Sequence, residues 1–178
     1  KADQAFDAQS SILNESVPIH IQDFVFQYPD NQKKLIDIQN LIIKKGQRLG
    51  IQGQVGSGKS TLARVLAGLS HEYKGSVTIF GQNLRELKNS ELRTLVALVD
   101  QNPFLFGTSI RENLALNSVI SDQELWNWLH VVDLKTDFEK FPNGLDSMLG
   151  EWGINLSGGQ RQRVMIAMAL ANNPKLLI

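Results

Sequence analysis

Hydrophobic and polar residues alternate near the start of the chain in a pattern that predicts β-strands. Apolar residues at positions 19, 21, 24 and 26 predict the first strand, and the segment after it, YPDN at residues 28–31, is typical of a turn. A second strand is expected to end at a turn over residues 44–46. The predicted strands cover residues 19–26, 35–43, 77–80 and 95–99.

From residue 103 onward the pattern changes and predicts helices. Three serines are expected to begin them, and two of these have a capping partner three residues later. The expected starts are Ser109, Ser121 with Glu124, and Ser157 with Gln160. The last helix is expected to reach about residue 172, before Pro174, and residues 175–178 then begin a buried strand. The sequence therefore predicts a mixed α/β fold with a helical subdomain over about residues 103–172.

The segment GQVGSGKS, residues 53–60, matches every fixed position of the phosphate-loop pattern G-x-x-x-x-G-K-[ST]. Residues 48–52 before it form a short apolar run that predicts a buried strand. Residues 60–69 after it predict a helix with one apolar face, formed by Leu62, Val65, Leu66 and Leu69. Strand, glycine-rich loop and helix is the order that this pattern requires, so we expect a site for the phosphate groups of a nucleoside triphosphate.

The residue types in this loop suit a highly charged anion. Glycines carry no Cβ, so the backbone can curl around a phosphate with its N–H groups pointing inward. Lys59 supplies a charge for the β- and γ-phosphates, and the hydroxyl of Ser60 is placed to bind Mg²⁺. A charge-assisted bond from Lys59, about 1.5 to 3 kcal/mol, outweighs the helix dipole, about 0.3 to 1 kcal/mol. The expected nucleotide-binding residues are Gly53, Gln54, Val55, Gly56, Ser57, Gly58, Lys59, Ser60 and Thr61.

Composition narrows the class of protein. The 178 residues, 42% of them hydrophobic, suit one domain of ordinary size. The 18 basic and 18 acidic side chains balance, so no net charge attracts nucleic acid, and the lack of cysteine excludes a disulfide framework and a thiolate metal site. Residues 1–16 are polar and are expected to be a linker, and no apolar run approaches the ~20 residues that span a bilayer. Because the first methionine is Met148, we expect the chain to be a piece of a longer protein.

A second specific motif, LSGGQ at residues 156–160, lies at the start of the last predicted helix. Ser157 is the expected cap, and two glycines leave the N–H groups of the first turn accessible, which makes a second anion site like the first. With this motif the chain strongly resembles the nucleotide-binding domain of ABC transporters, over about residues 19–178. In that family the signature closes over the γ-phosphate bound by a second such domain, arranged head to tail. The residues that the resemblance assigns to this contact are Ser157, Gly158, Gly159 and Gln160.

The resemblance implies a P-loop NTPase fold with a RecA-like core, an antiparallel β subdomain and a helical signature-motif subdomain. It also implies ATP and Mg²⁺ as cofactors and ATP hydrolysis as the activity, with Lys59 and Gln101 as catalytic residues and Ser60 and Gln101 as metal ligands. Tyr28 is similar to the aromatic residue that stacks on adenine. Gln101 is similar to the Q-loop glutamine, which touches Mg²⁺ and the attacking water. Residues 96–100 also fit a second interpretation, a Walker B strand in which Asp100 holds the metal.

Residues 102–113 favour the Q-loop interpretation, because they are similar to the exporter segment that docks the transmembrane domain. Residues 150–153, GEWG, are similar to an exporter loop of the GExG type with the same partner. The resemblance thus implies an incomplete ATP-binding domain over residues 17–178, at the cytoplasmic face of a membrane and joined by the linker to a transmembrane domain. The Walker B aspartate and catalytic glutamate of the family lie beyond the strand that begins at residue 175. We therefore expect this chain alone not to hydrolyse ATP at a normal rate.

Three functions stay open on the sequence. The chain is the ATPase motor of an exporter, a regulatory domain that binds nucleotide and dimerises without hydrolysing it, or a soluble cassette protein that acts on DNA or ribosomes. Charge balance and residues 104–113 weigh against the third function, and the intact LSGGQ weighs against the second. None of these motifs identifies a transported substrate or says whether the partner domain is identical.

Overall fold

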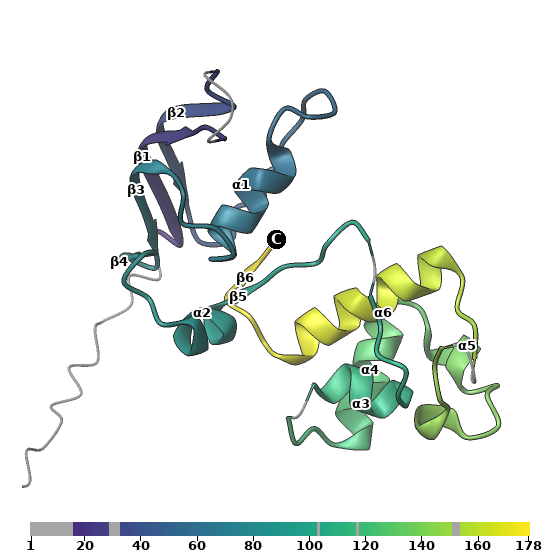
Figure 1. Cartoon of the computed structure of the whole chain (residues 1–178). Coiled ribbons are helices and arrows are strands. Elements are labelled where there is room, and N and C mark those ends of the chain that lie inside the picture. Colours follow the sequence, from purple (N-terminus) through teal and green to yellow (C-terminus); the bar gives the residue numbers. More distant parts are fainter. Residues whose placement is uncertain (1–15, 29–32, 103, 117, 151–153) are drawn as a thin grey trace, which may run out of the picture. The chain divides into compact units, whose positions relative to one another are not determined.

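The computed structural model describes residues 16–28, 33–102, 104–116, 118–150 and 154–178, in two compact units that divide between Asn89 and Ser90 (Figure 1). The first unit contains β1 (Ile19–Phe26), β2 (Ile36–Ile43), α1 (Lys59–Leu66), β3 (Lys74–Ile79) and β4 (Gln82–Asn83). Helix α2 (Asn89–Leu95) begins at the division. The second unit contains β5 (Val96–Ala97), α3 (Ile110–Ala115), α4 (Asp122–Val131), α5 (Lys135–Phe138), the 3₁₀ turn η1 (Gly144–Asp146), α6 (Gly158–Ala171) and β6 (Leu176–Leu177).

The first unit is built on a four-stranded antiparallel sheet in the order β2-β1-β3-β4. The alternation that predicted β1 places Ile19, Ile21 and Phe24 in the core, where they are almost fully buried. Between Gln22 and Val25 the register of β1 against β3 shifts. Gly75 lies opposite this irregularity with φ +85°, and a Cβ there would lie 2.2 Å from the carbonyl oxygen of Asp23. Only glycine therefore fits at this point of the sheet.

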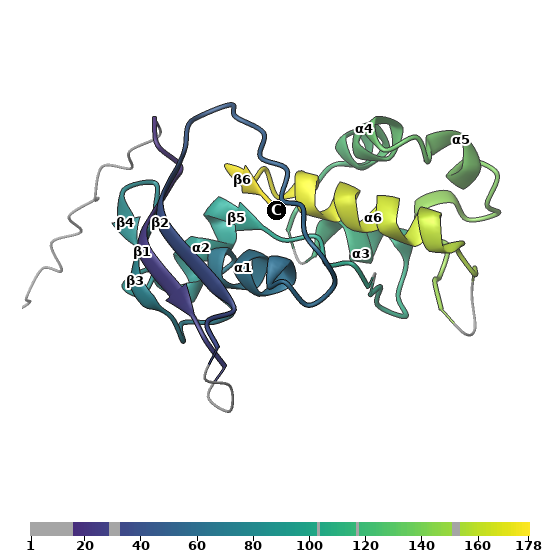
Figure 2. The same cartoon turned by 90° about the horizontal axis from the view of Figure 1, so that it is seen from above.

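Helix α1 lies beside this sheet in both ribbon views (Figures 1 and 2). It buries Leu62, Val65 and Leu66, as the apolar spacing predicted. The same prediction was wrong for Leu69, which is 68% exposed, because the helix ends at Leu66. The backbone turns at Gly68, whose φ is +70°, so the apolar face does not continue to residue 69.

The buried strand predicted over residues 48–52 is not formed. These five residues have no strand conformation and are exposed, with Leu49 and Ile51 at 45% and 47%. Their apolar composition favours a strand, but a strand also needs a neighbour that bonds its backbone N–H and C=O groups. The structure pairs no strand with this segment within the described ranges.

The second unit combines a short parallel strand pair with helices. Strands β5 and β6 pair in parallel, with Val96 opposite Leu176. Helices α3 and α4 both pack along α6, the long yellow helix of Figures 1 and 2. Their contact buries a hydrophobic cluster, and Trp126 and Trp128 are partly buried against it. The fully buried members of this cluster are Ile110, Leu114, Leu125, Leu129, Leu134, Phe138, Val164 and Ala167. None of the helices within the described ranges is long and apolar enough to cross a membrane.

The predicted helix starts are confirmed. Ser109, Ser121 and Ser157 each accept a hydrogen bond from the backbone three residues later, and in all three the partner side chain returns to the backbone of the serine. Because this reciprocal box satisfies donors that the first turn would otherwise leave unpaired, it fixes where each helix begins.

Two predicted strands have different limits in the structure. Strand β3 begins at Lys74 and ends at Ile79, before Phe80, whose φ of +49° breaks the extended backbone. Residues 95–99 contribute only the two-residue strand β5, since Leu95 is the last residue of α2. Helix α2 was not predicted; its buried residues, Leu92 and Leu95, were too few to show a helical period in the sequence.

Candidate functional site

The predicted phosphate loop leads directly into α1. Gly58 is the N-cap residue of that helix with φ +92°, and no side chain caps the helix start. A Cβ on Gly58 would lie 2.7 Å from Cγ1 of Ile36, so glycine is required both by the backbone and by its contact with β2. Within the loop the N–H of Ser57 donates to the carbonyl of Gln54 at 3.2 Å, and Val55 is fully exposed. The loop thus presents an uncapped helix start, the arrangement that attracts an anion.

Lys59 lies over this loop. Its Nζ donates to the carbonyl oxygens of Gly53 and Gln54, both at 2.8 Å. The next residue, Ser60, is exposed, so its hydroxyl is accessible to a metal ion. A cationic amine, a hydroxyl and the first turn of a helix therefore meet within one nine-residue segment.

Tyr28 is brought to the same place from the end of β1. Its hydroxyl lies 3.2 Å from Oγ1 of Thr61, which belongs to the first turn of α1. The ring meets Phe26 edge to face, with centroids 5.2 Å apart and an angle of 86° between the planes. Because 49% of Tyr28 is exposed, the ring offers surface on which a planar group can stack.

The signature residues form the start of α6 in the second unit. Oγ of Ser157 accepts from the N–H of Gln160 at 3.2 Å, and Oε1 of Gln160 accepts from the N–H of Ser157 at 3.0 Å. The amide of Gln160 also donates to Asp137 of α5 at 3.2 Å, so this side chain is used inside the unit. Among the described residues, a Cβ on Gly158 or Gly159 would meet nothing within 4 Å. The packing of this part of the chain therefore does not require these two glycines.

Gln101 follows β5 in the second unit. Both it and Asp100 are exposed, and Oδ1 of Asp100 accepts from the backbone N–H of Gln101 at 2.6 Å. The carbonyl oxygen of Asp100 accepts a 3.5 Å hydrogen bond from Gln162 of α6. The structure therefore links this turn to the helix that begins at the signature motif.

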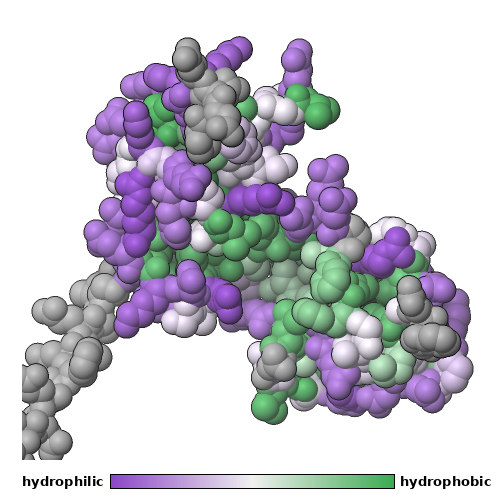
Figure 3. Space-filling model, in the orientation of Figure 1, coloured by the Kyte–Doolittle hydropathy of each residue, from purple (hydrophilic) through white to green (hydrophobic). Residues whose placement is uncertain are grey.

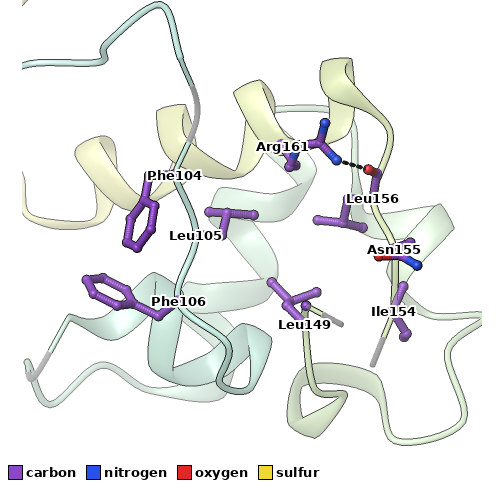
Figure 4. A pocket seen from close by; sticks show the side chains of 9 residues that line it. Phe104, Leu105, Phe106, Leu149, Ile154, Asn155, Leu156 and Arg161 are labelled. Atoms are coloured by element: carbon purple, nitrogen blue, oxygen red, sulfur yellow. Dashed lines mark hydrogen bonds between the residues drawn. The ribbon is translucent and has the colours of Figure 1, made fainter. Parts of the chain in front are cut away.

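A pocket of about 230 Å³ opens in the second unit between residues 104–106 and the segment before α6 (Figure 4). Phe104 and Phe106 form an edge-to-face pair at its edge, 5.3 Å between centroids, and both are strongly exposed. Leu105, Leu149 and Leu156 line it, and Arg161 hydrogen-bonds to the carbonyl of Leu156. In the space-filling view, hydrophobic surface is visible on the second unit (Figure 3).

Residues 151–153 of the predicted GExG loop lie outside the described residues; Gly150 lines the pocket.

Asn113 fixes the backbone that carries the two phenylalanines. Its side chain is fully buried on α3. Oδ1 accepts from the N–H of Phe106 at 2.8 Å, and Nδ2 donates to the carbonyl of Phe106 at 3.0 Å and to Oγ1 of Thr108 at 3.1 Å. From the other side, the N–H of Phe104 donates to Sδ of Met165 on α6 at 3.2 Å. The sequence analysis included Asn113 only as the last residue of the exporter-like segment 102–113; the signal for its structural role is a polar residue on the apolar helix face formed by Ile110 and Leu114.

An ion-pair cluster ties three elements of the second unit together. Arg111 of α3 donates to Asp122 of α4 and, at 2.8 Å, to Asp146 of η1. The hydrogen bonds from Arg111 hold the pKa of both carboxyl groups below their usual range, and raise the pKa of the guanidinium. These exposed groups have no role in the predicted chemistry. They link the start of α4 to α3.

Comparison with known proteins identifies the family to which this chain belongs. The family model for the ABC transporter matches residues 36–178. The Bacillus subtilis protein "Uncharacterized ABC transporter ATP-binding protein YwjA" is 38% identical over 154 residues, which are 86% of this chain and 27% of that protein. "Multidrug resistance-like ATP-binding protein MdlB" of Buchnera aphidicola is 34% identical over 164 residues, 92% of this chain and 28% of that protein. "P-glycoprotein 14" of Caenorhabditis elegans is 35% identical over 180 aligned residues, which cover 100% of this chain and 14% of that protein.

A solved structure agrees with the sequence relatives. The "Structure of a bacterial Atm1-family ABC exporter with ATP bound" superposes with a TM-score of 0.84 at 30% identity, covering 99% of this chain and 30% of that one. The chain therefore spans less than a third of the length of each of these proteins. The family model covers both the loop that leads into α1 and the signature at the start of α6. The chain is an ATP-binding domain with the P-loop NTPase fold, and it belongs to the ABC transporter family.

Proposed function

We propose that this chain is part of the ATP-binding and ATP-hydrolysing motor domain of a membrane exporter, at the cytoplasmic face of the membrane and attached to a transmembrane domain. The observation that carries the proposal is the start of α1. No side chain caps this helix, and Lys59 and Ser60 directly follow its N-cap residue, Gly58. Support also comes from the relative MdlB, whose name describes a multidrug resistance-like ATP-binding protein.

The residues of the first unit fit ATP with Mg²⁺. The donor set consists of an ammonium group, backbone N–H groups and hydroxyls, which suits phosphate oxygens and a hard cation that prefers oxygen ligands. Lys59 would exchange its two loop carbonyls for phosphate oxygens, and the hydroxyl of Ser60 would hold the cation. When bound, Mg²⁺ neutralises charge on the phosphates during transfer. Tyr28 would stack on the adenine. Stacking of this kind depends on the aromatic ring of the base and not on its hydrogen-bonding groups.

Gln101 is proposed to position the attacking water. The side chain of Gln101 is exposed, unlike that of Gln160, which is part of a capping box. The backbone N–H of Gln101 is held by a hydrogen bond to Asp100. Positioning of this kind places water and phosphate in line without chemistry on the protein itself. The same interpretation leaves Asp100 as the residue that shapes the turn, through its hydrogen bond to the backbone of Gln101.

The signature is proposed to complete the site of a second copy or a related domain. Its own capping box leaves Gly158 and Gly159 with open space where side chains would be. A phosphate from another chain could therefore approach the first turn of α6 closely, and the positive end of the helix dipole would favour it. Two chains arranged head to tail would each supply a loop and a signature.

The pocket beside Phe104 and Phe106 is proposed to dock a cytoplasmic helix of the transmembrane domain. Its wall combines apolar side chains with the polar Asn155 and Arg161, and exposed aromatic rings such as its two phenylalanines are enriched in protein interfaces. Asn113 and Met165 hold the backbone of these rings from α3 and α6. Movement of a docked helix would therefore be transmitted to the helix that begins at the signature.

Isothermal titration of the chain with MgATP tests the binding site, and sedimentation in the presence of MgATP tests the head-to-tail arrangement. Lys59→Ala removes the loop function, whereas Gly158→Glu blocks the signature with a side chain for which the structure has room. Neither variant alone should associate with itself on adding MgATP. An equimolar mixture should associate, because one intact loop then faces one intact signature.

Failure of the unchanged chain to bind MgATP would overturn the proposed function. Failure of the mixture alone would overturn the head-to-tail arrangement and leave nucleotide binding intact. Binding and association without hydrolysis in the assembled transporter would favour the regulatory alternative.

A further inference from the structure

We propose that Thr61 is a positioning residue for the nucleotide base: its hydroxyl fixes the ring of Tyr28 and so sets the preference of the site for a nucleotide over a bare polyphosphate. This inference rests on the proposed function and deepens its ATP site. It adds a role for Thr61 beyond the phosphate loop to which the residue belongs.

The geometry holds the Tyr28 ring at two points. Phe26 is buried in the sheet and presents its ring edge to face, 5.2 Å from the ring of Tyr28. At the far end of the ring, the hydroxyl of Tyr28 lies 3.2 Å from Oγ1 of Thr61, across 33 residues of sequence. One point belongs to β1 and the other to α1, so the ring bridges the sheet and the phosphate-loop helix.

Fixing the ring matters because Tyr28 is half exposed. A half-exposed tyrosine that is not held samples several rotamers, and ordering it on binding costs conformational entropy. With the hydroxyl held by Thr61, that freedom is already restricted before a ligand arrives. The benefit reaches only ligands that carry a base, because inorganic polyphosphate has nothing to stack on the ring.

The chain contains a matched control. Tyr73, its other tyrosine, is buried in the same unit, and its hydroxyl has no hydrogen-bond partner among the described residues. Its ring packs against Phe24 instead, 5.2 Å between centroids. Removing that hydroxyl leaves the contact between Tyr28 and Thr61 untouched.

The experiment measures the ratio of the affinity for MgATP to the affinity for magnesium tripolyphosphate, by titration of the full chain. Taking the ratio cancels any contact that Thr61 makes with phosphate, since both ligands would lose it. Tyr28→Phe keeps the ring and removes the hydroxyl, and Thr61→Val keeps the shape of the side chain and removes its partner. Thr61→Ser keeps a hydroxyl, and Tyr73→Phe is the control.

We expect the ratio to fall about 2- to 10-fold in Tyr28→Phe and in Thr61→Val, the effect of one modest hydrogen bond. The double variant should fall no further than either single one, and Thr61→Ser and Tyr73→Phe should keep the original ratio. An unchanged ratio in Tyr28→Phe, or additive losses in the double variant, would overturn the inference while nucleotide binding stands. If the unchanged chain binds neither ligand, the proposed function fails and this inference with it.

Discussion

The candidate site of the first unit and that of the second unit are stabilised by different kinds of contact. In the first unit, the phosphate loop is one continuous segment shaped by its own backbone, through the left-handed Gly56 and Gly58 and the hydrogen bond from the N–H of Ser57 to the carbonyl of Gln54. In the second unit, the proposed contact surfaces depend on side chains far apart in sequence. Asn113 holds the backbone of Phe106, and Gln160 is bound by Asp137, 23 residues away.

Because of this difference, substitutions in the two sites should affect ligand binding and folding stability to different extents. A loop that is held by its backbone can lose a functional side chain and keep its shape. A surface that is held by buried side chains loses its shape when one of them is removed. Substitutions in the first unit should therefore affect ligand affinity, whereas substitutions in the second should affect stability first.

The largest effect on stability is expected from Asn113→Ala. The change removes a fully buried side chain and leaves the N–H and C=O groups of Phe106 without the partner that binds them, so the free energy of unfolding should fall by roughly 2 to 4 kcal/mol. Urea unfolding followed by circular dichroism measures this. Asn127→Ala on the exposed side of α4 is the matched control and should change little. A loss below about 1 kcal/mol in Asn113→Ala would show that the segment is held by other contacts.

The next effect is expected on binding. Lys59→Ala should weaken the affinity for MgATP by about 10- to 150-fold, the value of a charge-assisted bond of about 1.5 to 3 kcal/mol. Its unfolding transition should stay where it is, because the partners of Lys59 among the described residues are two exposed loop carbonyls. Titration calorimetry and urea unfolding of the same samples check both halves. A large stability loss would contradict the distinction between the two units.

Ser157→Ala should have a smaller effect, on stability. It removes the cap of α6, which costs about 1 kcal/mol in other helices. Ser121→Ala removes an identical box from α4, where no glycine follows, and is expected to cost about the same. If Ser157→Ala were neutral while Ser121→Ala was not, the start of α6 would be held by Asp137 and Arg161 rather than by its cap.

The smallest effect is expected from pH. Hydrogen bonds from Arg111 lower the pKa of Asp122 and Asp146 in the folded chain. Their stabilising effect is therefore complete above the unfolded pKa of about 4 and is lost as the pH falls through the lowered folded values. The melting temperature of Asp146→Asn should lie slightly below that of the unchanged chain near neutral pH, and this gap should close in acid. A gap that is constant with pH would exclude the ion pair as its cause.

Much of the fold follows from local patterns. The phosphate loop, the three helix starts, the capping boxes at Ser121 and Ser157 and the strands β1 and β2 were predicted because each depends on residues within a few positions of one another. The strand predicted over residues 48–52 was wrong because apolar composition does not show whether another strand lies beside the segment. The buried position predicted for Leu69 was wrong because the helix ends at Leu66, before the turn at Gly68.

The sequence by itself determined the chemistry of the chain: a glycine-rich loop with a lysine and a hydroxyl, and a capped LSGGQ helix. These motifs act through backbone geometry that their own residues impose. Only the tertiary structure decided that Tyr28 lies against Thr61, that Asn113 holds Phe106 and that Met165 holds Phe104. Contacts of this kind join residues that are distant along the chain, and side chains find such partners only when packing of the core brings their elements together.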